Sequence, residues 1–469
     1  MKNLHTLTCL NKKISLPIIA DLNMQIEINE NPFQLPIEDF FLMAARINKK
    51  RSFLFVSKIL GKHLPIDPKT GLLTGFLLAA RYEEVRTGKK SSKREKLLDY
   101  YTHSLAFFED EPFVEKEVSC PVIIGFAETA TALGHSFYQA FKDAAFFHTT
   151  RENVNEVSSI ISFEEEHSHA TSHRCYVDES FLDNEREIIL VDDELTTGNT
   201  AINIIREIQQ KYPRKVYTVV SILDWRTKEQ EKAMTALEKE LGIVVHFVSL
   251  LKGTFNLREG NGLFTPQSKQ DVVDKRNGKA IQLEYEDLSE YIGDRIHPFT
   301  STTLSDEINS HYYLIDTGRF GIEKAQRNDA WLKEAGDYLA SKRTTKKALV
   351  IGTGEFMYIP MKIASYMGEN VFYQSTTRSP IYPNNESHYG AKTAYSFPNP
   401  EDQRIDHYLY NLEIDSYEEV FILFERKVDA DKLLPLIEKI QETAINKLTI
   451  VYCYGGEELG SEKCKFRFI

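Results

Sequence analysis

Short runs of apolar, often β-branched residues alternate with amphipathic segments along the chain from residue 122 onward. Five of these runs have the length and composition of buried strands, namely residues 122–127, 144–148, 188–191, 216–223 and 244–250. Amphipathic spacing predicts helices over about residues 130–141 and 200–211. Such alternation is typical of βαβ units, in which helices cover a parallel sheet.

Polar residues dominate between residues 256 and 303, and the apolar periodicity fades there. We interpret this segment as a connector with one short helix near residues 284–292. A second alternating stretch follows, with strands expected at 348–351, 371–374, 420–424 and 448–454 and helices at 361–366 and 430–442. The pattern therefore predicts an α/β domain at 25–255, a polar connector at 256–303 and a second α/β domain at 304–469.

The two α/β domains resemble each other in sequence. VIIGFAET from residue 122 is similar to LVIGTGEF from residue 349, so that Glu128 corresponds to Glu355. A Thr-Thr-Arg tripeptide follows in each domain and ends at Arg151 and Arg378. EIILVDDELTTGNT from residue 187 aligns with EVFILFERKVDAD from residue 419, where the acidic pair has become Phe-Glu and the TTGNT loop has no counterpart. The ordered matches indicate a duplication in which the second copy is degenerate.

Composition excludes several classes of protein. The 469 residues carry 57 Lys and Arg against 69 Asp and Glu, a net charge of −12, which argues against a basic surface for nucleic acid. No apolar run reaches the roughly 18 residues of a membrane span. The five cysteines are scattered without a CxxC pair, which argues against a disulfide framework and a structural zinc site. We expect a cytoplasmic protein that binds neither nucleic acid nor membranes, and any phosphate it handles must be bound by a local site.

The segment IILVDDELTTGNT, residues 188–200, is the most informative in the chain. An apolar strand ends in two carboxylates, Asp192 and Asp193, and a short loop then opens a helix. The loop residues that can present backbone N–H groups and hydroxyls to a phosphate are Thr196, Thr197, Gly198, Asn199 and Thr200. The two carboxylates can accept hydrogen bonds from sugar hydroxyls, so the segment suits a ribose 5-phosphate group. The structural alternative is an acidic strand end before an N-capping loop.

This segment resembles the phosphoribosyl pyrophosphate (PRPP) motif of type I phosphoribosyltransferases. The resemblance implies a parallel sheet flanked by helices with an N-terminal hood, and catalytic roles for Asp192 and Asp193, which would also contact Mg²⁺ indirectly through the ribose of PRPP. It places the pyrophosphate loop, which in this family often holds a cis non-proline peptide bond, at residues 125–131, with Ala127, Glu128 and Thr129 as binding residues. Because this loop has no lysine, the binding of pyrophosphate would depend on backbone N–H groups, hydroxyls and Mg²⁺. Arg151 is either an added cation there or a solvated surface residue.

The same family carries a mobile lid where this chain has the polar segment 152–183, with SFEEEHSHATSHRCY. The resemblance makes Glu166 and His167 catalytic candidates, and the other polar candidates of the lid are Glu164, Glu165, His169, His173 and Arg174. An ordinary solvated loop is the second reading, and a metal site is the third, since HSHxxxH is not a recognised zinc spacing.

Residues 51–65, RSFLFVSKILGKHLP, resemble the hood strand of orotate-type phosphoribosyltransferases, where bases are bound; a hairpin with exposed lysines is the alternative. HYYLIDTGRFG in the second domain looks like a repeat of this strand, with Arg319 as a candidate ligand contact. Arg378, in TTRSP at residues 376–380, is a second candidate for a phosphate or carboxylate, or else simply marks a strand end.

Nearly the whole chain resembles the orotate-phosphoribosyltransferase-like proteins with a C-terminal TRSP domain, found in bacterial tellurite-resistance stress operons. Its markers are NPFQLP, AARINKKRSFLFVS, GFAETATALG, EEHSHATSH, VDDELTTGNT, DTGRFG and TTRSP. The resemblance implies Mg²⁺-dependent transfer of a 5-phosphoribosyl group from PRPP to a base-like acceptor, for biosynthesis or salvage of a nucleoside-like molecule. It also implies small-molecule partners and either a monomer acting as a pseudo-dimer or a homodimer. The alternative is a non-catalytic sensor of PRPP or a nucleotide, which the missing lysine favours, whereas the long polar lid argues for retained chemistry.

Overall fold

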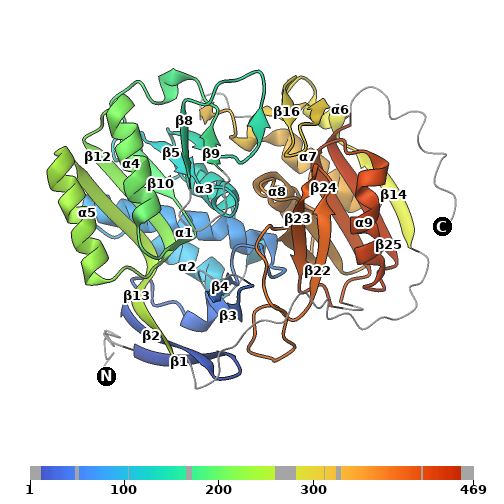
Figure 1. The fold of residues 1–469 in the computed structure, drawn as a ribbon, viewed down its shortest axis with the longest axis horizontal. Coiled ribbons are helices and arrows are strands. Elements are labelled where there is room, and N and C mark those ends of the chain that lie inside the picture. The colour runs from blue at the N-terminus through green and yellow to red at the C-terminus, as the bar shows by residue number, and fades with distance from the viewer. Residues whose placement is uncertain are drawn as a thin grey trace.

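The computed structural model describes residues 12–47, 52–103, 105–164, 172–258, 281–310, 312–323, 329–413 and 416–455. These residues form two α/β halves that lie side by side, the first at the left of Figure 1 and the second at the right. The predicted α/β class, with a parallel sheet followed by a second domain, is confirmed.

A nine-stranded sheet organises the first half, in the order β1-β2-β13-β12-β10-β5-β6-β19, with the short β11 paired to β12. Its parallel strands are β13 (Val244–Arg258), β12 (Val216–Asp224), β10 (Ile188–Val191), β5 (Val122–Gly125), β6 (Ala145–His148) and β11 (Glu194–Leu195). Its antiparallel strands are β1 (Lys12–Ile19), β2 (Leu22–Glu30) and β19 (Ile322–Glu323). Every residue of β5, β6 and β10 is buried, as expected for strands covered on both faces.

Helices cover both faces of this sheet (Figure 1). Facing the second half are α1 (Pro68–Thr87) and α3 (Ala130–Gln139), whereas α4 (Asn199–Lys211) and α5 (Lys228–Leu241) lie on the outer face and α2 (Arg94–Thr102) follows α1. The side chain of Asp67 accepts the N–H of Lys69, and Pro68 occupies the first turn, which fixes the start of α1.

The second half repeats the central strand order of the first. Its parallel sheet runs β14 (Gln282–Asp287), β25 (Lys447–Tyr454), β24 (Glu419–Arg426), β20 (Ala348–Gly352) and β21 (Val371–Ser375). The helices are α7 (Ala330–Lys342), α8 (Tyr358–Tyr366) and α9 (Ala430–Gln441), and a hairpin joins β22 (Ala394–Asn399) to β23 (Asp402–Tyr410). The order β25-β24-β20-β21 matches β12-β10-β5-β6 strand for strand, which supports the predicted duplication.

The halves pack through α1 and α3 of the first against α8 of the second (Figure 1). The ring of His135 on α3 stacks on the ring of Tyr358 on α8 at 3.6 Å between centroids. Gly71 lies so close to Met361 that a Cβ at this glycine would be 2.4 Å from the Met361 sulfur. Apolar side chains from both halves join the same buried clusters, so the interface is a continuous core.

The predicted connector is partly ordered into sheets, which sequence periodicity did not indicate. β13 continues to Arg258, residues 259–280 lie outside the described residues, and β14 then forms the edge of the second sheet. The expected helix covers only α6 (Ser289–Ile292). Five short strands follow or pair with this region: β15 (Ile296–His297), β16 (Thr300–Thr302), β17 (Ile308–Ser310), β18 (Tyr313–Leu314) and β7 (Asn153–Val154) of the first half, which pairs with β16. β19, from the second predicted domain, closes the first sheet.

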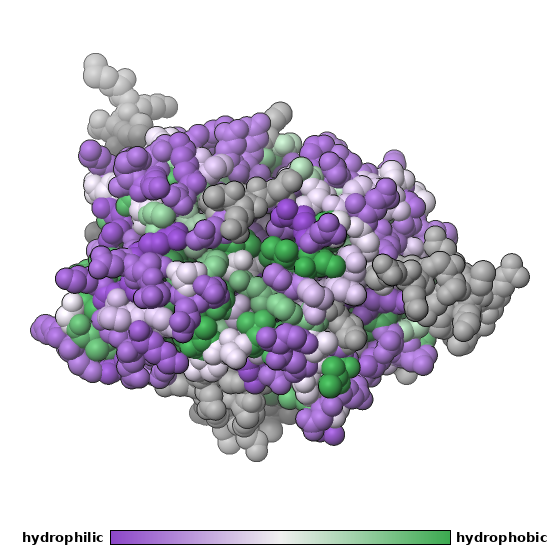
Figure 2. All heavy atoms as spheres, turned by 90° about the horizontal axis from the view of Figure 1, so that it is seen from above, coloured by the Kyte–Doolittle hydropathy of each residue, from purple (hydrophilic) through white to green (hydrophobic). Residues whose placement is uncertain are grey.

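Two further hairpins belong to the first half: β3 (Phe41–Ala45) with β4 (Phe53–Ser57), and β8 (Ile161–Glu164) with β9 (Ser172–Cys175). Hydrophilic residues cover most of the face in Figure 2, and hydrophobic residues gather near its centre. No helix in the described part of the chain is both long and apolar enough to span a membrane. Cys120, Cys175 and Cys453 are free thiols.

Candidate active site

A cavity of about 210 Å³ opens at the carboxyl ends of β5 and β10. Parallel strands place their carboxyl ends at one edge of a sheet, so residues that are distant in sequence meet there. Eight of the predicted site residues line the cavity: Ala127, Glu128, Thr129, Arg151, Asp192, Asp193, Thr196 and Thr200.

The acidic pair and the loop after β10 keep the arrangement that the sequence suggested. Asp192 is half-buried, and its Oδ1 accepts the N–H of Asp193 at 2.9 Å. The loop turns at Gly198, whose φ of 82° favours glycine, and α4 begins at the next residue. Thr197 accepts the N–H of Asn199 at 3.2 Å, so these two residues and Gly198 shape the turn, whereas Thr196 and Thr200 face the cavity.

A buried ion pair packs against this loop. Arg226 donates to both oxygens of Asp224, at 2.9 and 2.7 Å, and its guanidinium lies 3.5 Å from the centroid of the Phe247 ring. A Cβ at Gly198 would lie 3.2 Å from the Arg226 side chain. Sequence reasoning missed this support, although Asp224 and Arg226 follow directly after a predicted strand.

The loop after β5 forms the opposite wall of the cavity. The peptide bond between Ala127 and Glu128 is cis, in the loop where the resemblance places one. The N–H of Ala127 donates to Thr149 Oγ1 at 2.9 Å, which anchors the loop to the strand end of β6. Thr131 donates to the backbone oxygens of Glu128 and Glu355, each at 3.0 Å, and does not line the cavity.

Lys62 supplies the cation that this loop lacks. Its Nζ donates to Thr129 Oγ1 at 2.5 Å and lies 3.2 Å from Glu128 Oε2. Burial alone would raise the pKa of Glu128, but Lys62 and, after it, Arg151 outweigh burial and hold the pKa well below its ordinary value. The only sequence signal for this contact was the basic turn after the predicted hood strand.

The hood hairpin adds an apolar wall. Leu54, Phe55 and Leu60 line the cavity, and the Phe55 ring stacks on Trp225 at 4.9 Å between centroids. Because Trp225 is buried, the stack fixes the orientation of Phe55. Arg46 also lines the cavity, at the end of this hairpin.

The second half completes the site in the same chain. Thr377 Oγ1 donates to Glu128 Oε2 at 2.7 Å. Ser379 lines the cavity and accepts a hydrogen bond from Arg46 at 3.3 Å. The Tyr389 hydroxyl accepts the N–H of Ala45 at 2.7 Å, so residues after the TTRSP segment also support the hood.

Other predicted residues in the described part of the chain do not line this cavity. Glu166 and His167 fall outside the described residues. His173 is buried, with its Nδ1 2.8 Å from Thr149 Oγ1, so it belongs to the interior. Arg319 does not line this cavity: it is 1% exposed, pairs with Glu425 and Glu152, and lines a different cavity, so its role as a ligand contact stays a prediction. Arg378 does not line this cavity but a second one, which Arg151 also lines.

The residues at the strand ends fit a magnesium ion that arrives with a phosphorylated substrate. No cluster of three or more His, Cys, Asp or Glu side chains able to hold a metal ion occurs among the residues that the structure describes. The carboxylates of Asp192 and Asp193 nevertheless line the cavity, and Mg²⁺ is usually held by one or two carboxylates together with substrate phosphates and water.

Comparison with known proteins identifies both parts of the chain. The phosphoribosyl transferase family matches residues 40–254, and the TRSP domain that lies C-terminal to this transferase domain matches residues 316–440. No curated protein matches the chain. The chain therefore carries a phosphoribosyl transferase domain followed by a C-terminal TRSP domain, and its first half is a pentosyltransferase domain.

Solved structures of low sequence identity show partial similarity. The adenine phosphoribosyl transferase from Trypanosoma brucei, in complex with AMP, pyrophosphate and ribose-5-phosphate, is 12% identical with a TM-score of 0.31, over 49% of this chain and 82% of that one. The adenine phosphoribosyltransferase from Leishmania tarentolae is 17% identical with a TM-score of 0.28, over 50% of this chain and 90% of that one.

Proposed function

We propose that the cavity at the ends of β5 and β10 transfers a 5-phosphoribosyl group from PRPP to a nitrogenous base or base-like acceptor and releases pyrophosphate. The observation that carries the proposal is the meeting of three groups in one cavity: the acidic pair Asp192 and Asp193, the hydroxyls of Thr196 and Thr200, and the Lys62–Thr129 contact.

The donor would lie along the strand ends. Thr196 and Thr200, at the N-terminus of α4, present hydroxyls where the helix dipole also favours a 5-phosphate. Asp192 and Asp193 then accept hydrogen bonds from the ribose hydroxyls, because they precede this loop directly. Their negative charge also stabilises the oxocarbenium-like character that develops at C1 as the leaving group departs.

The leaving pyrophosphate would face the loop after β5. Lys62, Arg151 and Arg46 supply positive charge there, and Thr129 supplies a hydroxyl. Mg²⁺, brought by PRPP and contacted by Asp192 and Asp193 indirectly, neutralises part of the pyrophosphate charge when it is bound. The chain's own residues orient the donor and stabilise the charge that moves onto the leaving group.

The acceptor would lie against the hood. Leu54, Phe55 and Leu60 form an apolar wall, and the ring of Phe55, fixed by Trp225, suits the face of a planar base. We assign the reaction to the cytoplasm and to biosynthesis or salvage of a nucleoside-like molecule in a stress response, as the resemblance implies.

A transferase is favoured over a PRPP sensor. The absence of a lysine from the loop after β5 was the feature that favoured a sensor, and Lys62 reaches that loop from the segment before α1. A site with a cation beside the leaving group is equipped for chemistry as well as for binding.

The test replaces the acidic pair. Asp192→Asn with Asp193→Asn should reduce Mg²⁺-dependent pyrophosphate release from PRPP, measured with a panel of bases, by at least about 1,000-fold if each carboxylate contributes as a typical electrostatic group does. The matched control is Glu334→Gln with Asp337→Asn, which makes the same charge change at two exposed positions of α7. Undiminished release in the Asp192/Asp193 variant, or wild-type protein that binds labelled PRPP and leaves it intact with every base, would contradict the proposal.

A further inference from the structure

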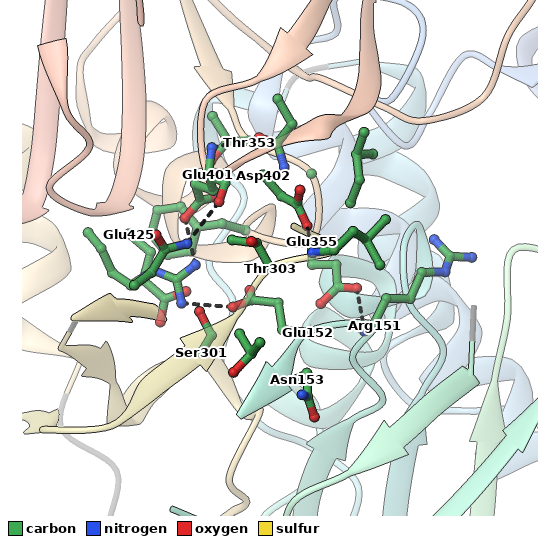
Figure 3. A pocket seen from close by; sticks show the side chains of 18 of the residues that line it. Arg151, Glu152, Asn153, Ser301, Thr303, Thr353, Glu355, Glu401, Asp402 and Glu425 are labelled. Atoms are coloured by element: carbon green, nitrogen blue, oxygen red, sulfur yellow. Dashed lines mark hydrogen bonds and ion pairs between the residues drawn. The ribbon is translucent and has the colours of Figure 1, made fainter. Parts of the chain in front are cut away.

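A second cavity lies between the two halves, at the position that corresponds to the candidate active site (Figure 3). Its volume is about 280 Å³, larger than that of the first cavity. One wall is the loop after β20, residues 353–356, which the duplication aligns with the loop after β5. Arg151, Glu152 and Asn153 of the first half form another wall, so both halves contribute to this cavity.

This second cavity cannot bind PRPP as the first one would. Phe424 stands where Asp192 stands in the first half, and it is fully buried. Glu425, which corresponds to Asp193, accepts two hydrogen bonds from Arg319, at 3.0 and 2.9 Å. The carboxylates that would hold ribose hydroxyls are therefore absent or occupied.

The floor of the cavity is a closed ion-pair network. Glu152 pairs with Arg319 at 3.2 Å and with Arg426 at 2.9 Å, and Arg426 also pairs with Glu401 at 2.6 Å. Both arginines are already paired with carboxylates, so neither is available to bind a negatively charged group of a ligand.

His407 lines the cavity and has one ring nitrogen without a hydrogen-bond partner among the described residues. It is 2% exposed, and its Nδ1 lies 3.1 Å from Thr376 Oγ1. Thr376 Oγ1 already accepts the N–H of Gly354 at 3.0 Å, and the acceptor in reach of its own proton is Nδ1. The imidazole proton is then on Nε2, which is buried and has no hydrogen-bond partner among the described residues. Burial lowers the pKa of His407 to about 4, so the ring is neutral at physiological pH.

Arg378 adds the positive charge. It is half-buried and lines the same cavity, and it forms no hydrogen bond or ion pair with another residue that the structure describes. The residues on either side of Arg378 contact the first site instead. Thr377 donates a hydrogen bond to Glu128, and Ser379 accepts one from Arg46. Arg174, whose Nη1 donates to the backbone oxygen of Arg151 at 3.2 Å, is a further cation on the cavity wall.

We propose that this second cavity binds a small phosphorylated polyol, such as a sugar phosphate, whose phosphoryl group accepts hydrogen bonds from Arg378 and from Nε2 of His407. A guanidinium and a neutral imidazole N–H match the acceptor oxygens of a phosphoryl group. Asp402, which lines the same cavity and lies outside the ion-pair network, accepts hydrogen bonds from hydroxyl groups. The proposal does not depend on the transfer reaction, because none of these residues lines the first cavity.

Isothermal titration with ribose 5-phosphate tests the proposal, in a background where the first site is blocked. Thr196→Glu places a carboxylate in the first phosphate loop, so that wild-type protein should bind two equivalents and this variant one. Adding Arg378→Gln or His407→Asn should weaken the remaining binding about 10- to 100-fold, the range for loss of one charge-assisted hydrogen bond. Asparagine places its amide oxygen near the position of Nδ1, so the contact to Thr376 is kept while the Nε2 donor is lost.

The controls separate the two sites and the two ends of the ligand. Arg206→Gln, an exposed change on α4, should leave binding unchanged, and ribose without phosphate should bind far more weakly. Binding that persists in Thr196→Glu with Arg378→Gln, no binding in Thr196→Glu alone, or a preference for succinate over ribose 5-phosphate would overturn the proposal. If Thr196→Glu still bound two equivalents, the assignment of the 5-phosphate to the loop at Thr196 would be contradicted, and binding in the second cavity would be judged by the Arg378→Gln and His407→Asn variants.

Discussion

The loop after β5 and the loop after β20 are held in the same way, yet they border different cavities. The N–H of Ala127 donates to Thr149 Oγ1 at 2.9 Å, and the N–H of Gly354 donates to Thr376 Oγ1 at 3.0 Å. Each loop is thus anchored to the first threonine after the neighbouring strand. These matching hydrogen bonds support the duplication inferred from sequence.

The two halves also exchange hydrogen bonds reciprocally. Thr150 of the first half donates to Glu355 of the second at 2.6 Å, and Thr377 of the second half donates to Glu128 of the first at 2.7 Å. Each threonine hydroxyl also accepts the N–H of the residue two positions later. These contacts join the halves, so they serve stability whether or not either cavity binds a substrate.

The carboxylates after the next strand differ between the halves. Asp192 and Asp193 line the first cavity, whereas Phe424 is buried and Glu425 is bound to Arg319 in the second. The symmetric part of the structure joins the two halves, and the asymmetric part includes the carboxylates to which we assign sugar binding. Three predictions follow from this separation of stability from function.

Of these three effects, the largest should come from Lys62, because no lysine occurs among the described residues that line the second cavity. Lys62→Met removes the cation beside Thr129, and we expect pyrophosphate release to fall about 100- to 1,000-fold. Lys62→Arg should retain part of the activity because it keeps the charge. The kinetics should show kcat falling more than KM for PRPP rises if Lys62 stabilises the leaving group rather than the bound donor.

Lys333→Met, which removes an exposed lysine from α7, is the control for the loss of one positive charge. Thermal unfolding of each variant checks that Glu128 without its partner does not unfold the protein. Equal kcat values for Lys62→Met and Lys333→Met would mean that the cation beside Thr129 does not distinguish the first cavity from the second.

The contrast between Lys62 and the acidic pair shows what sequence can predict. Residues 188–200 are contiguous, so an apolar strand, an acidic pair and a threonine-rich loop locate a cavity wall without knowledge of the fold. Lys62 meets Thr129 only because the segment before α1 packs against the loop after β5, a tertiary contact that leaves no local pattern. The sequence showed a basic turn and a loop without lysine but not that one completes the other.

The ion pairs of Arg319 and the strands at the sheet edges could not be predicted from the sequence for related reasons. The sequence around Arg319 suggested a ligand contact but not that its guanidinium is enclosed by Glu152 and Glu425, which come from distant segments of the chain. β19 has two residues and β14 follows a polar stretch, so neither has a periodicity long enough to predict a strand.

The intermediate effect concerns the reciprocal threonines. Thr150→Val and Thr377→Val each remove one hydrogen bond to a carboxylate with almost no change of side-chain shape, so each should lower the free energy of unfolding by about 1–3 kcal/mol. Only Thr377→Val should also lower transfer activity, because Glu128 lines the candidate active site and Glu355 lines the second cavity. Urea unfolding with a pyrophosphate-release assay measures both quantities, and equal losses of activity in the two variants would contradict the separation.

The smallest effect is a pH dependence to which buried histidines of both halves contribute, among them His63 and His148 in the first half and His407 in the second. Burial lowers the pKa of His148 and that of His407 from about 6.5 to about 4. As pH falls from about 6.5 towards 4, the unfolded chain takes up a proton at each histidine while the folded chain does not, so stability falls; above pH 6.5 both states are neutral and nothing is lost. Each histidine contributes at most about 1.4 kcal/mol of lost stability per pH unit in this window. Urea unfolding between pH 7 and 5 should show a shallower decline for His407→Asn than for wild type, since the carboxylates contribute equally to both proteins. The decline in the variant should be neither abolished nor unchanged, because His148 continues to contribute from the first half. A decline identical to that of wild type would mean that His407 is protonated in the folded state, and its Nδ1 would then donate to Thr376 rather than accept from it.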